Sequence, residues 1–441
     1  MPLPRCLAER PLPTLDGRCV YAEGVQALPL RAPLRGAQQA QACVVGAGIA
    51  GLCAALALAG QGLQVTLLEA RRVASGASGR NGGQALADYA CGIEALERRL
   101  GPPAALRAWQ LAELAVQRLR QRIAEHAIDC DWASGTLSVA RTPRDAARLH
   151  AALRHRQQQY AAAHLRWLDA AQVSRHVESP LYHGGVYDPH GAQLQPLLYT
   201  LGLARAALRL GVVLHEQSPV LRIERGADGY LVHCADGSLR APRLLLATGA
   251  VPGAPLRRLR ARVLPVATCM LATEPLARPV LHGAAPPAVC DTSFIPDYYR
   301  QDAAGRLLFG SGAYHGGRVL RDPAVRRRLL RQAMLRVFPQ LQHARITHDW
   351  GGWIDASANR APDFGRVGPD AVYVQGFSGH GLALSGLAGE LAAQALLAGP
   401  AGCADFELFA ALRHASLPGR GLLRRPVAAL GEILGRLQQL L

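Results

Sequence analysis

The sequence predicts an α/β protein of two domains, and three observations support this fold class. Residues 41–70 have the pattern of a strand, a glycine turn, an apolar helix and a second strand. Residues 371–397 repeat the strand, the glycine turn and the helix. Between them, residues 263–312 contain segments with the alternation of strands in a mostly antiparallel sheet. A chain of 441 residues is also longer than one ordinary domain.

The first unit has the glycine spacing of a dinucleotide-binding site. Gly46, Gly48 and Gly51 follow the apolar strand Ala42–Val45 and lead into a helix rich in Ala and Leu. We expect the first glycine to permit a tight turn, the second to let the backbone approach a pyrophosphate, and the third to allow close helix packing. Glu69 stands 69 − 51 = 18 residues after the last glycine, where an acid that binds a ribose hydroxyl is expected. This unit alone does not distinguish NAD from FAD.

A loop rich in Gly and Ser, residues 71–84, follows Glu69. Such a stretch is either a flexible linker or a loop shaped around a polar ligand, and its place directly after the acid favours the second interpretation. Ser78, Arg80 and Asn81 would supply a hydroxyl, a guanidinium and an amide to a pyrophosphate and to the polar edge of a ring.

Composition argues against several classes of function. The formal net charge is +17, the chain has no lysine, and the arginines are dispersed, so we expect no nucleic acid partner and only a general attraction for anionic ligands. The ten cysteines show no metal-binding or disulfide spacing, so we expect no metal site. No apolar run reaches about 20 residues and the first ten residues lack a signal-peptide pattern, which predicts a cytoplasmic protein without a transmembrane segment.

The remaining segments give a coarse order of elements. Residues 1–40 are expected to form an arm, residues 185–188 a turn, and residues 347–363 a turn-rich segment. We expect helices at 104–126, 144–163, 193–211 and 325–338. We expect strands at 132–140, 212–216, 220–224, 230–234, 243–248, 263–273, 294–300 and 306–312, with those at 220–224 and 230–234 forming a hairpin.

The last segment, residues 420–441, has leucines and an isoleucine at helical spacing next to arginines. A helix of this kind docks on the body of the protein, on another subunit as part of an oligomer, or on an anionic membrane surface, and all three remain open.

The motifs together resemble a known family. They are the glycine pattern with Glu69, SGASGRNGGQ at 75–84, ATGA at 247–250, DYYR at 297–300, WGGWIDASANRAPDFGR at 350–366 and GFSGHGLALSG at 376–386. This set is similar to the D-amino-acid oxidase-like FAD-dependent oxidoreductases, and within them to the gamma-glutamylputrescine oxidase branch, over residues 41 to about 400.

The resemblance implies an FAD-binding Rossmann-like domain interleaved with a substrate domain. Segments 41–90, 185–260 and 350–400 would form the FAD domain, and segments 91–184 and 261–349 the substrate domain, with 1–40 as an arm and 401–441 as a helical tail. An amine C–H would give a hydride to the flavin, the imine would hydrolyse to an aldehyde, and O₂ would be reduced to H₂O₂. The implied contacts with FAD are Gly46, Gly48, Ile49, Ala50, Gly51, Glu69, Ala70, Ser78, Arg80, Asn81, Gly82, Gly83, Gln84, Val220, Thr248, Gly249, Gly376, Gly379, His380, Gly381 and Leu382.

The chain departs from the family pattern at three places. No cysteine lies between Cys290 and Cys403, where sarcosine-oxidase-like relatives attach the flavin, so we expect non-covalent FAD. Those relatives also use a lysine beside the flavin to activate O₂, and its absence means that an Arg or His substitutes or that the acceptor is not O₂. Gln193 and Gln195 stand where the branch has histidines, which leaves the substrate open.

The candidate catalytic residues are His380, Tyr298, Arg300 and Trp353. On a strand, Tyr298 and Arg300 would share one face and bind a substrate carboxylate such as that of a gamma-glutamyl group, unless Arg300 is solvated at a strand edge. Trp353 would form an aromatic wall or belong to the core. His380 would add a proton or charge beside the flavin, or fill the glycine turn.

Asp355 would attract a protonated amine, orient Arg360 or form a structural ion pair. The sequence thus favours an amine oxidoreductase acting on a gamma-glutamyl amine. The alternatives are a D- or N-methyl amino-acid oxidase, a dehydrogenase that uses another acceptor, and a non-catalytic FAD-binding subunit of a complex.

Overall fold

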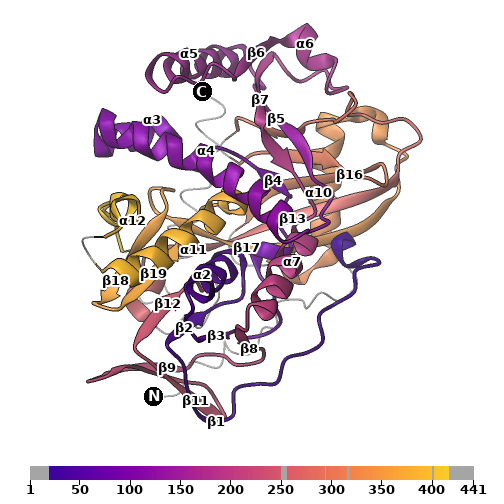
Figure 1. Ribbon diagram of the computed structural model, residues 1–441. Helices are drawn as coiled ribbons and strands as arrows, with labels where there is room; N and C mark the ends of the chain where they lie inside the picture. The colour runs from indigo at the N-terminus through magenta and orange to yellow at the C-terminus, as the bar shows by residue number, and fades with distance from the viewer. Residues whose placement is uncertain (1–18, 250–255, 294, 315–317, 400–401, 417–441) are drawn as a thin grey trace.

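The computed structural model describes residues 19–249, 256–293, 295–314, 318–399 and 402–416 (Figure 1). The predicted tail helix at 420–441 and the first part of the predicted arm lie outside the described residues.

A six-stranded sheet forms the centre of one half of the molecule. Its strands, in spatial order, are β18 (Asp363–Gly368), β19 (Ala371–Gln375), β12 (Arg243–Leu246), β2 (Ala42–Val45), β3 (Val65–Leu68) and β8 (Val213–His215). All neighbours are parallel except β18 and β19. Every residue of β2, β3 and β19 is buried, as expected for strands covered on both faces.

Helices cover one face of this sheet (Figure 1). They are α2 (Ile49–Gly60), α4 (Pro102–Glu125), α7 (Pro196–Arg209) and α11 (Gly381–Ala398). The two nucleotide-type helices, α2 and α11, cross closely, because a Cβ built on Gly389 would lie 2.1 Å from the Ala50 carbonyl oxygen. Of the described helices, α11 is the one long and apolar enough to cross a membrane, but 72% of it is buried inside the protein, as in a core helix.

A four-stranded sheet covers the other face. Its order is β1 (Gly36–Gln39), β11 (Gly237–Ala241), β10 (Gly229–His233) and β9 (Arg222–Gly226). Leu34, Val45, Leu68, Val232 and Leu239 belong to the apolar layer between the two sheets. The predicted hairpin is confirmed by the antiparallel pairing of β9 and β10. The arm contributes β1, which pairs with β11.

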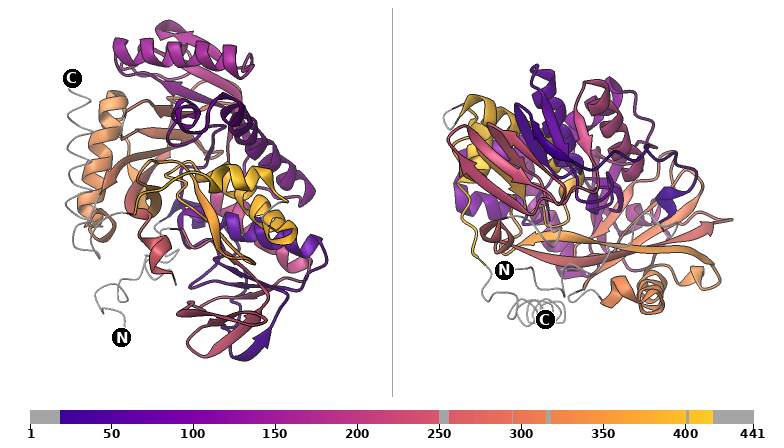
Figure 2. Two further views of the ribbon diagram at one scale, coloured as in Figure 1. Left: turned by 90° about the vertical axis from the view of Figure 1, so that its left-hand side faces the viewer. Right: turned by 90° about the horizontal axis from the view of Figure 1, so that it is seen from below.

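A nine-stranded sheet forms the second half of the molecule. Its order is β17 (Ile346–Ser357), β13 (Val263–Pro275), β16 (Arg306–Tyr314), β15 (Tyr298–Gln301), β14 (Ala288–Asp291), β5 (Ala133–Val139), β7 (Gly184–Gln193) and β4 (Gln84–Ala85), with β6 (Arg166–Asp169) also paired to β7. The prediction of a mostly antiparallel sheet is confirmed, since only β14 and β5 are parallel. Helices α9 (Arg318–Arg321) and α10 (Pro323–Val337) pack on the face turned away from the six-stranded sheet (Figure 2).

Shorter elements complete the chain. They are α3 (Ile93–Leu100), α5 (Pro143–Gln159), α6 (Ala170–Ser174), α8 (Arg257–Arg260), α12 (Ala404–Ala410) and the 3-10 helices η1 (Val20–Ala22), η2 (Ala77–Gly79) and η3 (Pro339–Leu341). Caps set some of their starts: the Thr142 side chain accepts from the Asp145 amide at the start of α5, and Asp169 and Gln172 form a capping box on α6.

Two local predictions are wrong. Residues 347–357 are not turn-rich, because β17 runs through Ser357 and pairs with β13 from Val263 onward, and the predicted turn is confined to 358–361. Its glycines allow close approach within a strand, since a Cβ on Gly351 would lie 2.4 Å from the Leu320 side chain. Residues 185–188 are likewise in β7 and not in a turn, and a Cβ on Gly185 would lie 2.8 Å from the Ser138 carbonyl oxygen.

Sheet membership therefore differs from the expected segments at three strands. β4 lies within segment 41–90, and β7 and β17 lie mostly within 185–260 and 350–400, yet all three belong to the nine-stranded sheet. The strands predicted within 91–184 and 261–349 do lie in that sheet.

Candidate functional site

The first glycine turn joins β2 to α2. Gly46 has φ +106°, so a residue with a side chain would be strained there. A Cβ on Gly51 would lie 1.9 Å from the Gly46 carbonyl oxygen, which confirms that this glycine permits close packing of the helix. Gly48 is the N-cap residue of α2 and offers no side chain to the helix. The first N–H groups of α2 therefore face the end of the sheet.

The loop after Glu69 is folded against this turn and is not a linker. The Ser78 hydroxyl accepts from the Ile49 amide at 3.0 Å, in the first turn of α2. The Asn81 side chain is used within the loop: Nδ2 donates to the Ala77 carbonyl oxygen at 3.0 Å and Oδ1 accepts from the Gly83 amide at 2.9 Å. Asn81 thus shapes the loop, while Ser78 stands beside the helix start.

Arg80 joins the same loop to the nine-stranded sheet. Its side chain is buried, and Nε donates to the Ser75 carbonyl oxygen at 3.0 Å. Its own carbonyl oxygen accepts from Trp350 Nε1 at 3.0 Å. A Cβ on Gly352 would lie 3.8 Å from the Arg80 side chain, so this part of β17 faces the loop.

Glu69 lies at the end of β3, next to the glycine turn. Its carboxylate accepts from the Ala47 amide at 2.8 Å and from the Arg71 amide at 2.9 Å. Burial raises the pKa of Glu69 and the two amides oppose that shift. The predicted acid is therefore at the correct edge of the sheet, with Ala70 directly after it.

The end of β12 forms the next part of the site. A Cβ on Gly46 would lie 2.5 Å from the Ala247 carbonyl oxygen and 3.6 Å from Thr248 Cα. Gly249 follows with φ +54°. Thr248 and Gly249 thus lie beside the first glycine turn. Val220 is buried in the apolar layer between the six- and four-stranded sheets.

The second glycine turn, Gly376 to His380, is held by β17. Gly376 and Gly379 have φ +77° and +97°. Asp355 Oδ2 accepts from the Gly376 amide at 2.6 Å, and the Asp355 carbonyl oxygen accepts from the Ser378 amide at 3.0 Å. Burial raises the pKa of Asp355 to about 6, against the effect of the backbone amides of Gly376, Asp355 and Phe377. Asp355 therefore shapes the turn, a role that none of the three predicted ones describes.

His380 is the N-cap residue of α11, which begins with Gly381 and Leu382. Its Nδ1 is buried and has no hydrogen-bond partner among the described residues. Burial lowers the pKa of His380 to about 4, the positive charge of Arg360 adds to the shift, and Asp88 opposes it. The imidazole is therefore neutral at pH 7. The neighbouring residue, Gly379, is exposed.

On β15 the predicted alternation is confirmed. The Tyr299 hydroxyl donates to Tyr182 on the face that α10 covers. Tyr298 lies on the other face, where a Cβ on Gly82 would meet its ring at 2.9 Å.

Arg300 shares the Tyr298 face and is 2% exposed, so the alternative of a solvated edge arginine is wrong. Its Nε donates to the Gly82 carbonyl oxygen at 2.8 Å and its Nη2 to the Tyr21 hydroxyl at 3.3 Å. These contacts are with the protein, so the arginine orders the loop around Gly82 and Gly83. Gln84 is held similarly, with Nε2 donating to the Val289 and Tyr299 carbonyl oxygens.

Trp353 does not share the space around the glycine turns. It packs against the core that α10 covers, as the core alternative predicted. Gln193 donates to the Pro286 carbonyl oxygen, and Gln195 caps α7 by accepting from the Leu198 amide at 2.8 Å.

Sequence reasoning missed Tyr21, whose hydroxyl donates to the Asn81 carbonyl oxygen at 3.0 Å and whose ring meets Trp350 edge-on. Its position in an arm without a motif gave no signal.

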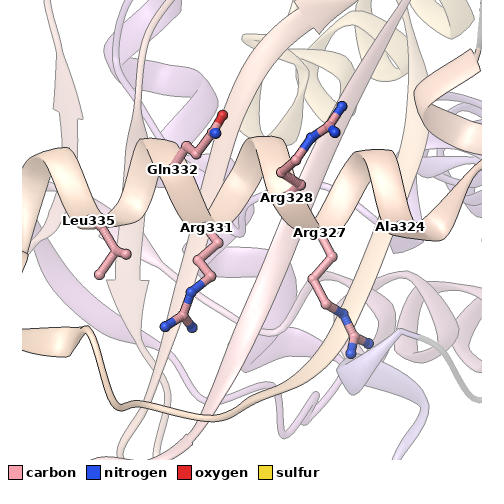
Figure 3. A pocket seen from close by; sticks show the side chains of 6 residues that line it. All are labelled: Ala324, Arg327, Arg328, Arg331, Gln332 and Leu335. Carbon is pink, nitrogen blue, oxygen red and sulfur yellow. The ribbon is translucent and has the colours of Figure 1, made fainter.

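A group of arginine side chains lies apart from the two glycine turns. Arg327, Arg328 and Arg331 line a shallow hollow on the outside of α10, together with Ala324, Gln332 and Leu335 (Figure 3). Arg327 donates to Asp349 on β17 at 2.7 Å. Because α10 covers the outer face of the nine-stranded sheet, this hollow is not part of the candidate site.

The comparisons with known proteins agree with this geometry. A family profile described as "FAD dependent oxidoreductase" matches residues 41–395. The chain belongs to the FAD-dependent oxidoreductase family. The resemblance seen in the motifs is thereby confirmed, and the protein is an FAD-dependent enzyme. Both glycine turns, Glu69 and the end of β12 lie inside the matched region of this oxidoreductase.

Curated relatives cover most of the FAD-dependent oxidoreductase. The gamma-glutamylputrescine oxidoreductase of Escherichia coli is 36% identical over 392 residues, which are 88% of this chain and 90% of the relative. The probable oxidoreductase OrdL of Haemophilus influenzae is 36% identical over 371 residues, 83% of this chain and 84% of the relative. Among solved structures, an L-amino acid deaminase of Proteus vulgaris superposes with a TM-score of 0.68 at 21% identity, covering 87% and 96% of the chains. That likeness supports the fold.

The residues present fit FAD at both ends of the cofactor. Gly48 brings the start of α2 close to Ser78, whose hydroxyl oxygen would lie 2.8 Å from an added Cβ, and the Glu69 carboxylate binds the Ala47 amide beside it. At the start of α11, Gly379 is exposed and His380 Nδ1 lacks a partner among the described residues, although the rest of the helix is mostly buried. The two helix N-termini would together provide amide donors for a bound pyrophosphate and flavin ring.

Proposed function

We propose that this FAD-dependent oxidoreductase oxidises the C–N bond of gamma-glutamylputrescine or a related gamma-glutamyl amine. The observation that carries the proposal is the 36% identity with the Escherichia coli gamma-glutamylputrescine oxidoreductase, which extends over 88% of this chain. Both glycine turns and the DYYR strand lie within the region that the family profile matches, 41–395. This supports a complete enzyme over a non-catalytic FAD-binding subunit.

We propose that FAD binds non-covalently, with its pyrophosphate at the start of α2 and its flavin ring at the start of α11. The flavin, when bound, accepts a hydride from the amine C–H, and the imine released hydrolyses to an aldehyde. Within the chain, the amides of Gly379, Gly381 and Leu382 stabilise negative charge at the ring edge, because they stand at the positive end of a helix dipole, whereas the His380 amide donates to the Phe377 carbonyl oxygen. Asp355 fixes those amides through Gly376 and Ser378.

We assign His380 and Tyr298 to the substrate side of the site. A neutral His380 accepts or donates a hydrogen bond and brings no charge, since burial keeps its pKa near 4. Arg300 and Trp353 act indirectly, because Arg300 holds the loop at Gly82 and Trp353, which is partly buried, packs against the core that α10 covers. The FAD-binding domain would consist of the six- and four-stranded sheets with their helices. The substrate domain would consist of the nine-stranded sheet, including β7 and β17.

For the electron acceptor we propose O₂, which would be reduced to H₂O₂. A second candidate is a dehydrogenase that passes electrons to another acceptor, and the complete lack of lysine favours it. An amino-acid oxidase remains an alternative for the substrate, and the cytoplasmic location stays a prediction.

The test is anaerobic addition of amines to the purified yellow protein. We expect gamma-glutamylputrescine to bleach the flavin absorbance, and putrescine, which lacks the glutamyl group, to bleach it far more slowly. If no gamma-glutamyl amine bleaches the flavin while a D- or N-methyl amino acid does, the substrate proposal is wrong. Re-oxidation by O₂ and by a dye then separates oxidase from dehydrogenase, and release of the flavin by acid denaturation tests non-covalent binding.

A further inference from the structure

Three side chains from distant parts of the chain meet away from the flavin site. Glu113 lies on α4, His164 lies in the segment between α5 and β6, and His190 lies in β7. Their possible ligand atoms all lie within 4.8 Å of one another. The sequence predicted no metal site because these three residues are widely separated and form none of the short spacings typical of metal ligands.

A bulge in β7 presents this cluster. Ser134 of β5 pairs with Ala192, but Thr136 pairs with Asp188, so three residues of β7 stand opposite one residue of β5. Bulges of this kind redirect side chains and often mark functional positions. Gly191 permits the bulge, since a Cβ there would lie 2.3 Å from the Thr136 hydroxyl.

The ring nitrogen of His164 at the centre of the cluster is not satisfied by the protein. Nε2 is buried and has no hydrogen-bond partner among the described residues. The nearest carboxylate oxygens are Glu113 Oε1 at 3.5 Å and Asp188 Oδ1 at 3.8 Å, which is too far for a good hydrogen bond. The rings of His164 and His190 stack with centroids 4.1 Å apart, so one ring has to turn for both to bind the same ion. Asp188 Oδ1 accepts from the His190 amide at 2.8 Å, whereas His164 Nε2 stands among these ligand atoms without a hydrogen-bond partner among the described residues.

These separations suit a small divalent cation. In a tetrahedral Zn²⁺ site the bonds from the metal to nitrogen and oxygen ligands are about 2.0–2.1 Å long, which places neighbouring ligand atoms about 3.4 Å apart. The distances from His164 Nε2 to the two carboxylates, 3.5 and 3.8 Å, are close to that value. Two imidazoles with carboxylates favour Zn²⁺ over Mg²⁺ or Ca²⁺, which prefer oxygen ligands alone. Two carboxylates also balance the charge of the cation.

We propose that Glu113, His164 and His190 bind one Zn²⁺ ion, with Asp188 at the fourth position. The ion would connect α4 to β7 and to the segment before β6, and so join the helical layer to the nine-stranded sheet. Its role is structural, because all four positions are taken by protein and none remains for a substrate.

The experiment uses the full-length FAD-loaded protein after removal of any affinity tag, since polyhistidine binds Zn²⁺ itself. Protein is dialysed against Zn²⁺ and then against buffer, and bound metal is measured by mass spectrometry. We expect one Zn²⁺ per chain in the wild type and in the control His343→Ala, which changes an exposed histidine elsewhere. We expect loss of that ion in His164→Ala and His190→Ala, and at least tenfold weaker binding in Glu113→Gln.

Thermal unfolding gives a second readout. Added Zn²⁺ should raise the Tm of the wild type and of His343→Ala but not of the two cluster variants, because a ligand of the folded state stabilises it. Co²⁺ substitution should add absorption at wavelengths longer than those of the flavin, as a tetrahedral site does. His190 is exposed, so its replacement leaves no cavity and tests the site even if His164→Ala fails to fold.

No Zn²⁺ uptake by the wild type, or equal uptake by His190→Ala and the wild type, would overturn the proposal. Neither result bears on amine oxidation.

Discussion

Gly48 and Ser78 meet at the start of α2, and two alanine substitutions can separate the possible reasons for the glycine. The Gly48 backbone has φ −86° and ψ −175°, which alanine adopts without strain. The added Cβ in Gly48→Ala would lie 2.8 Å from the Ser78 hydroxyl oxygen. That hydroxyl would have to leave the Ile49 amide, from which it now accepts at 3.0 Å.

The effect on stability follows from this one hydrogen bond. Losing it costs about 1 kcal/mol, whether through Gly48→Ala or through Ser78→Ala. In the double variant the methyl of residue 48 is 3.7 Å from Cβ of residue 78, which is ordinary contact. The double variant should therefore lose about 1 kcal/mol and not 2, a coupling that urea unfolding of the wild-type apoprotein and the three variant apoproteins would measure.

The effect on FAD affinity should be different. If Gly48 leaves room for the pyrophosphate, its methyl stays in the way after Ser78 is shortened. We then expect both Gly48→Ala and the double variant to bind FAD at least tenfold more weakly than Ser78→Ala, which is about 1.4 kcal/mol. Titration of apoprotein with FAD, followed by flavin fluorescence, measures this. If the double variant binds FAD as tightly as Ser78→Ala, the glycine serves only Ser78 and the reasoning is refuted.

Three further predictions test the surroundings of the site. Gly51→Ala places a methyl 1.9 Å from the Gly46 carbonyl oxygen and should cost about 3 kcal/mol or more by chemical unfolding; a cost below about 1 kcal/mol would contradict the packing role. Glu390→Ala leaves the 2%-exposed Arg122 without its carboxylate at 2.8 Å and should cost about 3–5 kcal/mol, whereas Glu390→Gln should cost less. Burial lowers the pKa of His380 from 6.5 to about 4. Between these two pH values the unfolded chain binds a proton at His380 that the folded protein does not, so the free energy of unfolding decreases as the pH falls from about 6.5 to about 4. His380→Asn should remove that part of the slope, and an unchanged slope of unfolding free energy against pH would contradict the assignment.

The nucleotide-binding half was predictable because its signals are local. β2 has the bounds expected from the sequence, and β3 and β19 lie where the two repeated units predicted strands, since strands buried on both faces are continuous apolar runs between turns. The three glycines and Glu69 lie within one supersecondary unit, so their spacing already fixes their geometry. The family profile and the relatives then confirmed the resemblance that the later motifs indicated.

The substrate half was less predictable because its strands are specified by partners far away in the chain. The glycines of β7 and β17 suggested turns, yet each is needed where Ser138 or Leu320 comes close, and that information lies in other segments. The role of Arg300 was equally hidden, because its partners Gly82 and Tyr21 precede it by 218 and 279 residues. Periodicity placed its side chain on the correct face but could not identify what it meets there.

These contacts change how a variant of the nine-stranded sheet should be interpreted. Arg300 holds the Gly82 carbonyl oxygen, and Trp350 holds that of Arg80, so two strands of this sheet fix the loop that carries Ser78. Loss of either contact loosens the loop from outside the nucleotide-binding unit. A fall in activity after Arg300→Ala is therefore evidence for a substrate carboxylate only if the FAD content of the variant is unchanged. The geometry predicts that FAD retention falls as well, because the side chain is bound to the cofactor loop and is 2% exposed.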